Sequence, residues 1–238
     1  MTFPHSTNSL MQRLQQAAPE LVSACERVDL KPGPWPGPDG KNDDCLYFPE
    51  TSFLALSLPY STGGSSTPQS ARLALMGRHS VWSRRQALSS DFLAEVLVPG
   101  HAMRVSDSVV RAVKTTLATW WLQVATSNQY LISQMARMTL CAHKHSAPQS
   151  LASWLLMAQH NSGASLLQIP MVALRHWLGW APDTWQSAWG ALESQGLVGL
   201  MGQGPLAKIQ IKALEASGLA CACHQVAKLY DPGQGSWG

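Results

Sequence analysis

Apolar residues recur at helical spacing near the N-terminus and then gather in short runs. Residues 9–25 have the spacing of a short helix or of a helix pair interrupted at Pro19. Residues 31–44 are so rich in proline and glycine that we expect a loop. From Cys45 to about Val105, turn-forming residues separate the runs CLYFPE, FLALSL, ARLALM, AEVLVP and HAMRVS. This pattern predicts an antiparallel β domain whose strands each bury one face, with residues 60–70 as a polar loop.

A long amphipathic helix is predicted to follow this β domain. Ser106 or Asp107 can cap its start. Its apolar stripe is formed by Val110, Val113, Leu117, Trp120 or Trp121, Val124, Tyr130 or Leu131, and Met135. A long helix with such a stripe usually packs against a second copy of itself, so we expect a homodimer, with residues 125–129 as a candidate break. The alternative is that the stripe packs on the chain's own β domain.

The remaining chain, from His145, predicts three helices and a β hairpin. The helices are expected over APQSLASWLLMAQH, PMVALRHWL and PDTWQSAWGALESQ, and Gly196 is suited to end the last of them. Two short apolar runs, LVGLM and AKIQI, are joined by the turn GQGPL and predict the hairpin. Elements in this order describe a winged helix.

Residues 178–192, LGWAPDTWQSAWGAL, have the outline of a helix-turn-helix, which in many proteins reads DNA. Gly179 can adopt the backbone conformation of the turn, and Pro182 suits the first position of the second helix, where an N–H would be unpaired. The spacing predicts a buried face formed by Trp185, Ala188, Trp189 and Leu192. The opposite face would carry Asp183, Gln186, Ser187 and Gly190.

Composition favours a folded, cytoplasmic protein. A chain of 238 residues with 45% hydrophobic and 13% charged residues can bury the core of one large or two ordinary domains. The N-terminus lacks the features of a secretory signal, and no apolar stretch is long enough to span a membrane, so we expect no membrane partner. The net charge of +3 is mild, and the part from Cys141 onward has nearly as many acidic as basic residues, whereas DNA-binding domains are usually more basic.

No cofactor and no metal are expected from the cysteine and histidine pattern. The five cysteines are irregularly spaced and contain no Cys-x-x-Cys pair, so we interpret them as reduced, mostly buried thiols. His143 and His145 lie at a predicted helix end without nearby partners, and we interpret them as a polar hinge. No nucleophile motif or pair of carboxylates has a spacing that suggests an enzyme.

Four segments resemble the Crp/Fnr family of bacterial transcription regulators, in the branch without a recognisable cyclic-nucleotide pocket. LYFPETSFLALSL is similar to the first β-roll strands, ALMGRHSVWSRRQAL to the glycine-containing segment, MTLCAHKHSAPQSLASWLLMAQH to the junction before the DNA-binding domain, and GLACACHQ to the C-terminal end. The resemblance implies an α+β fold. Residues 1–106 would form an antiparallel β-roll of the cyclic-nucleotide-binding-like, cupin-type class, residues 107–142 a dimerisation helix, and residues 143–238 a winged helix-turn-helix.

The sequence also departs from this family. Gly77 has no neighbouring glutamate, which nucleotide-binding members use, so we do not expect a cyclic nucleotide. Arg78, Arg84 and Arg85 could hold another anion, but we favour a solvated loop. The N-terminal cysteine cluster of the family's iron-sulfur sensors is missing.

Two further departures fall in the winged helix. Relatives tend to carry arginines where this chain has Ser150 and Ser153. Arg175 replaces a small residue, so either it swings out to the DNA backbone or the two helices cross at a wider distance.

The function implied is that of a homodimeric, sequence-specific DNA-binding transcription regulator with an unknown effector. Its partners would be a double-stranded, palindromic operator and, for an activator, RNA polymerase. Gln186 could bond an adenine edge, Asp183 could accept from cytosine and Ser187 could join either, while Arg175, Thr184 and Lys208 would contact phosphates. The alternative is a degenerate regulator that has lost DNA binding and acts as a dimeric protein-interaction module through exposed tryptophans.

Overall fold

The structure, a computed structural model, describes residues 6–35, 44–60, 69–83, 92–113, 117–162, 164, 166–204 and 207–229. The chain forms two compact units. The N-terminal unit comprises residues 1–71 and 76–131, and the C-terminal unit comprises residues 72–75 and 132–238. Among the described helices, none combines the length and the apolar character that crossing a membrane requires.

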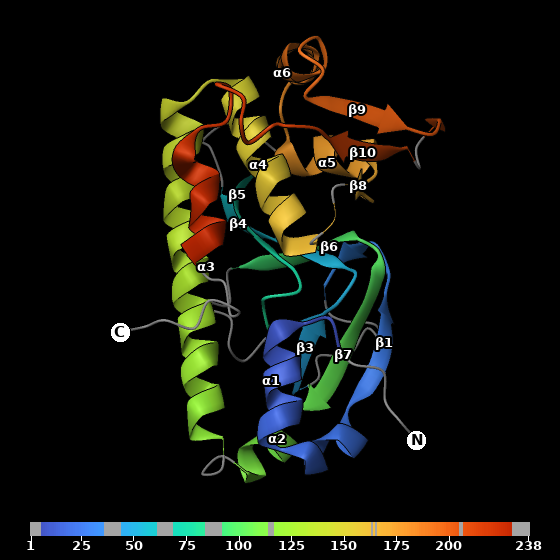
Figure 1. Ribbon diagram of the computed structural model, residues 1–238, viewed down its shortest axis with the longest axis vertical. Coiled ribbons are helices and arrows are strands. Elements are labelled where there is room, and N and C mark those ends of the chain that lie inside the picture. The colour runs from blue at the N-terminus through green and yellow to red at the C-terminus, as the bar shows by residue number, and fades with distance from the viewer. Residues whose placement is uncertain are drawn as a thin grey trace. The chain divides into compact units, whose positions relative to one another are not determined.

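Two antiparallel sheets form the β-roll (Figure 1). One has the order β1-β7-β3, with strands Glu26–Leu30, Gly100–Ser106 and Cys45–Pro49. The other has the order β2-β6-β4-β5, with strands Gly33–Pro34, Leu93–Val98, Phe53–Tyr60 and Gln69–Met76. The five strands predicted from the sequence are therefore confirmed, and the antiparallel pairing is confirmed in both sheets.

Two short strands were missed by the sequence analysis. β1 has only Val28 and Leu30 buried and reads as a charged segment, ERVDL. β2 lies inside the segment that we expected to be a loop, and its two residues pair with Val96 and Glu95 of β6. Residues 36–43 of that expected loop, and 61–68 of the expected polar loop, lie outside the described part of the chain.

The N-terminal helix is fixed to the β-roll by a buried asparagine. The predicted interruption at Pro19 is confirmed, because α1 spans Ser9–Ala17 and the 3-10 helix η1 spans Pro19–Ala24. Asn8 caps α1 by accepting hydrogen bonds from the amides of Leu10 and Met11. Its Nδ2 donates to the carbonyl oxygens of Pro49 and Ser80, both at 2.9 Å. One side chain thus supplies hydrogen-bond partners to two amides at the start of the helix and to two carbonyl oxygens of the β-roll.

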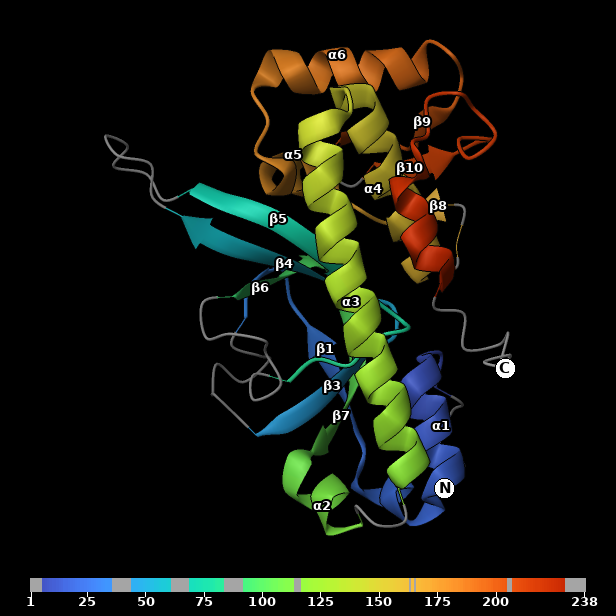
Figure 2. The same ribbon diagram turned by 90° about the vertical axis from the view of Figure 1, so that its left-hand side faces the viewer.

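The long predicted helix differs from expectation in where it breaks. α2 spans Asp107–Ala112 and α3 spans Ala118–Lys144, so the interruption comes before α3. Residues 125–129 are helical throughout, and Figure 2 shows α3 as one continuous helix. The predicted break at 125–129 is therefore wrong; the polar residues there are tolerated because Ser127 points inward and donates to the carbonyl of His79.

The apolar stripe of this segment packs on the chain itself, which is the alternative that the sequence left open. Within the N-terminal unit its buried members are Val110, Leu117, Trp120, Val124, Tyr130 and Leu131. Trp120 is 1% exposed, contacts the ring of Phe48 and donates a hydrogen bond from Nε1 to the carbonyl of Leu10 at 2.9 Å. The stripe therefore belongs to the core of the β-roll unit.

The C-terminal unit is a winged helix with one more strand than predicted. Its helices are α4 (Ala147–Ser162), α5 (Met171–Leu178) and α6 (Pro182–Glu193). Its sheet has the order β8-β10-β9, formed by Leu166–Leu167, Lys208–Ile211 and Val198–Met201. A 3-10 helix, η4, spans Ala222–Leu229. The three helices and the hairpin are confirmed, whereas β8, only two residues long, leaves no readable pattern.

Candidate nucleic-acid interface

The turn between α5 and α6 depends on Gly179. This residue has a φ of +59° and a ψ of +27°, a left-handed conformation that glycine adopts without steric cost. Its amide donates to the carbonyl of Arg175 at 3.0 Å and closes α5. Pro182 occupies the start of α6, as predicted, and Gly196 has a φ of +67° just beyond the end of α6.

The buried face of α6 is the predicted one. Trp185, Ala188, Trp189 and Leu192 are all buried, and the rings of Trp185 and Trp189 stack with centroids 5.9 Å apart. Trp154 of α4 and Trp177 of α5 meet edge to face at 4.4 Å. α6 packs against α4, so its buried side chains fix it in the unit.

The opposite face of α6 is polar and exposed. Asp183, Thr184, Gln186, Ser187 and Gly190 are all solvent-exposed. No side chain caps the start of α6, so its first amides point toward solvent at the positive end of the helix dipole. The helix itself carries no lysine or arginine. It can therefore offer hydrogen bonds to base edges and backbone amides to a phosphate, but no cationic side chain.

Basic residues of the winged helix lie on elements other than α6. Arg175 of α5 is exposed, as expected for a side chain that extends toward solvent. It lines an open hollow of about 460 Å³ together with Val172, His176, Gly179 and Trp180. On the wing, Lys208 is half-exposed and pairs with Met201 across the hairpin. His176 follows Arg175 and Lys212 lies just after β10; both are exposed, and the sequence analysis did not include them among the candidate contacts.

The tryptophans do not form the exposed surface that the protein-interaction alternative requires. In the part of the chain that the structure describes, no tryptophan is exposed, and Trp177 is only 4% exposed. The exposed large apolar residues of the C-terminal unit include Val172, Leu200 and Met201 in the winged helix. Three scattered side chains are ordinary for a protein surface and do not make a docking patch.

The glycine-containing segment is buried rather than solvated. Gly77 and residues 79–83 are buried; the amide of Ser9 at the start of α1 donates to the carbonyl of Arg78, and Trp82 exchanges backbone hydrogen bonds with Tyr47 of β3. Nε of Arg78 donates to Nε2 of His79 at 3.0 Å. The interpretation of a solvated loop is therefore wrong for residues 77–83, while Arg84 and Arg85 lie outside the described residues.

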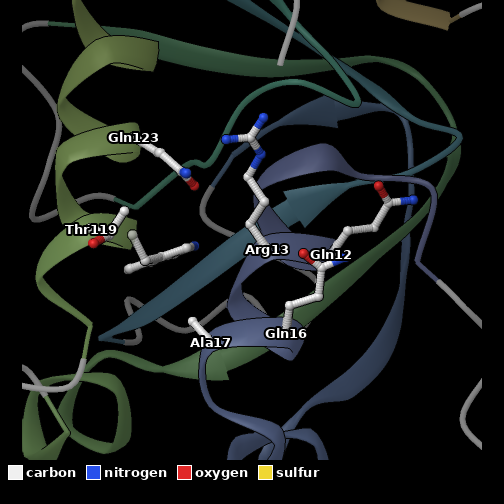
Figure 3. Close-up of a pocket in the computed structure, with 7 residues that line it drawn as sticks. Gln12, Arg13, Gln16, Ala17, Thr119 and Gln123 are labelled. Carbon is white, nitrogen blue, oxygen red and sulfur yellow. The ribbon is translucent and has the colours of Figure 1, made fainter. Parts of the chain in front are cut away.

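A separate polar pocket lies in the N-terminal unit between α1 and α3. Its volume is about 490 Å³, and Figure 3 shows Arg13 and Gln123 extending into the space between the two helices. The other lining residues are Gln12, Gln16, Ala17, Thr119 and Trp120. Amides, a hydroxyl and one guanidinium would suit a small polar molecule. The pocket shares no residue with the glycine-containing segment.

The cysteines are mostly buried, as predicted, but they are not all isolated. Cys25, Cys141, Cys221 and Cys223 are buried and Cys45 is half-buried. Nδ1 of His145 lies 3.6 Å from Sγ of Cys223, so the interpretation of His145 as a hinge residue without partners is wrong. The fold brings the pair Cys141 and His145 next to the pair Cys221 and Cys223. These pairs lie far apart along the sequence, so local spacing does not reveal the contact.

Several solved structures are similar to this arrangement of a β-roll and a winged helix. TTHB099 of Thermus thermophilus, a CRP-family transcriptional regulator, is 11% identical with a TM-score of 0.56, over 85% of this chain and 96% of that one. FixK2 of Bradyrhizobium japonicum is 17% identical with a TM-score of 0.57, over 83% and 98% of the two chains. A Crp/Fnr-family regulator of Eubacterium rectale is 16% identical with a TM-score of 0.52, over 88% and 97%.

The chain has the Crp/Fnr fold. It spans nearly the whole length of these regulators, so both the β-roll and the winged helix belong to the shared architecture. No protein-family model matches the sequence, and no curated protein matches it either. The chain thus shares the Crp/Fnr fold with proteins to which it is 11–17% identical.

Proposed function

We propose that the protein is a homodimeric, sequence-specific DNA-binding transcription regulator of the Crp/Fnr type, acting in the cytoplasm and not as an enzyme. Residues 1–106 would form the sensor-like domain, 107–142 the dimerisation region and 143–238 the DNA-binding domain. The observation that carries the proposal is the helix-turn-helix: α6 is fixed by four buried residues and presents Asp183, Gln186 and Ser187 to solvent. Its partner would be a palindromic operator, since a symmetric dimer reads two half-sites.

In this proposal, base contacts come from α6 and phosphate contacts come from its neighbours. Gln186 bonds an adenine edge, Asp183 accepts from cytosine, and Ser187 bonds either. Arg175, Thr184 and Lys208 bind phosphates, and the exposed Lys212 is added to them by its position after β10. With about three cations in each subunit, the slope of log affinity against log salt should be near −5, which is modest.

The dimer is proposed to form through the face of α3 that lies opposite the buried stripe. This face, the α3 seam, consists of Leu122, Ala125, Gln129, Ile132, Ala136 and Leu140, all of which are exposed. They recur at intervals of three and four residues, as in a coiled coil. Leu122 is 68% exposed and Ile132 is 49% exposed. Large apolar side chains at this spacing favour a second copy of α3 as their partner.

The effector is proposed to be something other than a cyclic nucleotide. No carboxylate neighbours Gly77 to bind a ribose hydroxyl, and the buried packing of residues 79–83 leaves the backbone there engaged. An effector pocket for a small polar molecule between α1 and α3 would act on the helix that carries the seam.

Selection of genomic fragments tests the DNA-binding proposal. The purified protein is incubated with fragments at about 50 mM salt, a concentration low enough to keep phosphate contacts strong. We expect enrichment of a two-fold symmetric site. Gln186→Ala should change the preference at one base of each half-site, at a cost of about 1–3 kcal/mol, whereas Lys208→Ala should weaken all sites evenly.

Matched control variants distinguish the loss of a DNA contact from a general loss of folding. Gln15→Ala on α1, at a half-exposed position, and Lys31→Ala after β1, at an exposed one, remove the same kinds of side chain from the N-terminal unit, and both should leave the selected site unchanged. If the folded dimer enriches no DNA sequence, the proposal of sequence-specific DNA binding is wrong. The winged helix would then serve protein contacts.

A further inference from the structure

Three cysteines and one histidine converge in the C-terminal unit. Cys141 lies in the last turn of α3 and His145 follows that helix, while Cys221 and Cys223 flank the start of η4. One ligand atom from each, three Sγ and one imidazole nitrogen, all lie within 4.8 Å of one another. The cysteines are buried and His145 is half-buried. In Figure 1 the red C-terminal helix lies beside α4 and the C-terminal half of α3.

The two closest contacts among these ligand atoms fit one tetrahedral ion, and every other pair lies within 4.8 Å. Around zinc, with Zn–S near 2.3 Å and Zn–N near 2.0 Å, neighbouring ligand atoms lie about 3.5–3.8 Å apart. Here Sγ of Cys141 and Sγ of Cys221 are 3.5 Å apart, and Sγ of Cys223 and Nδ1 of His145 are 3.6 Å apart. Three thiolates and one imidazole are a donor set that zinc uses in closed structural sites.

Other uses of these residues fit less well. A disulfide needs a sulfur–sulfur distance of about 2.05 Å, and joining Cys141 to Cys221 would leave Cys223 and His145 facing each other without a role. An iron-sulfur cluster places several irons between its cysteines and so holds their sulfurs farther apart than the distances seen here. The gathering of four ligand atoms within 4.8 Å of one another favours a single ion.

Two buried hydroxyls lie around the sulfurs. Oγ of Ser150 is 3.5 Å from Sγ of Cys141, and Oγ of Ser153 is 2.7 Å from Sγ of Cys221. Ser153 is fully buried, which is unusual for a serine unless its hydroxyl is bonded. Hydroxyls that donate to metal-bound thiolates are typical of the surroundings of zinc sites.

We propose that Cys141, His145, Cys221 and Cys223 bind one Zn²⁺ ion in a closed structural site. The ion ties the end of α3 to the C-terminal segment, and the hydroxyl of Ser153 on α4 orients the sulfur of Cys221. The proposal does not rest on DNA binding. The sequence analysis expected no metal, because the ligand pairs, Cys-x-x-x-His and Cys-x-Cys, are far apart in sequence and neither is a recognised zinc spacing alone.

Metal content and cobalt spectroscopy test the site directly. The chain is expressed in zinc-supplemented medium, freed of any histidine tag, and measured by elemental analysis; we expect one zinc per chain. The reduced, metal-free protein titrated with Co²⁺ should then show the visible d–d and charge-transfer bands of tetrahedral cobalt bound by thiolates. Zn²⁺ should displace the cobalt.

Variants assign the ligands. Cys221→Ser and Cys223→Ser should lose zinc, while Cys25→Ser, which removes a buried thiol from the N-terminal unit, should keep it. His145→Cys should retain stoichiometric zinc and shift the cobalt bands toward those of a four-thiolate site, a readout that is independent of whether the serine variants fold. Ser153→Ala should weaken Co²⁺ binding about 10- to 100-fold.

Three results would overturn the proposal. The first is folded, reduced wild-type protein that contains no zinc and gives no tetrahedral cobalt spectrum. The second is a folded Cys221→Ser variant with the zinc content and cobalt spectrum of the wild type. The third is a Cys141–Cys221 disulfide in protein alkylated at the moment of lysis.

Discussion

Trp120 and Leu10 are joined by a hydrogen bond from the indole Nε1 to the main-chain carbonyl oxygen, 2.9 Å long and buried. The bond links α3 to α1, although the two residues are 110 positions apart. The next residue, Trp121, offers a comparison, because among the described residues its Nε1 has no hydrogen-bond partner.

Trp120→Phe is expected to lower the free energy of unfolding by about 1 kcal/mol or more, because it removes this bond and part of a buried ring. Trp121→Phe should cost clearly less, since it removes no bond. Urea unfolding of the two variants, followed by circular dichroism, measures the difference. Equal losses would mean that the bond from Trp120 adds nothing to stability.

Gly179→Ala is expected to destabilise the C-terminal unit by about 1–2 kcal/mol, because alanine is strained at a positive φ. Gly190→Ala is its matched control on α6. Gly190 has no positive φ, and a Cβ there would meet no atom within 4 Å. Alanine at this position should stabilise the protein by about 0.5–1 kcal/mol. The midpoint temperature of thermal unfolding should therefore shift in opposite directions for the two substitutions. A shift of the same sign in both would contradict the turn geometry.

Leu122→Glu and Ile132→Glu are expected to convert the proposed dimer to a monomer, since each places a charge within the α3 seam. Both positions are exposed in the single chain, so its secondary structure should persist. Val172→Glu adds the same charge at another exposed apolar position, 62% exposed on α5, and should leave the dimer intact. Sedimentation equilibrium gives the mass of each species. A dimer that survives both seam substitutions would place the interface elsewhere.

Alkaline pH is expected to weaken the fold through Cys25. Burial raises the pKa of this thiol from its ordinary value of 9.0 to about 11. The folded state favours the neutral thiol, so its contribution to stability is complete below pH 9 and is lost as the pH rises toward 11. The free energy of unfolding, measured across this pH range, should decline more steeply for the wild type than for Cys25→Ala. Parallel curves would show that Cys25 does not contribute to the decline.

The sequence could predict those elements whose pattern is local. The buried face of α6 follows from spacing alone, because Trp185, Ala188, Trp189 and Leu192 lie on one side of any helix formed there. The turn at Gly179 follows from the conformational range of a single residue type. The strands β3 to β7 are long enough for their apolar runs to be read between turns.

Long-range relationships escaped prediction for a physical reason. Periodicity shows that the stripe containing Trp120 and Val124 is apolar, but it does not show which surface covers it; here the chain's own β-roll does so. The cluster of Cys141 and Cys221 depends on folding of the segment between them. A strand of two residues, such as β8, is defined by its partner β10 and has no pattern of its own.

The absence of cationic side chains from α6 has a consequence for how such a regulator would find its site. Non-specific attraction to DNA is mostly electrostatic, and an exposed carboxylate at Asp183 opposes it. A molecule that reads DNA through such a helix would spend little time bound to the bulk of the chromosome. More of its copies would remain in free diffusion, so that even a small number of molecules in a cell could occupy a matching operator.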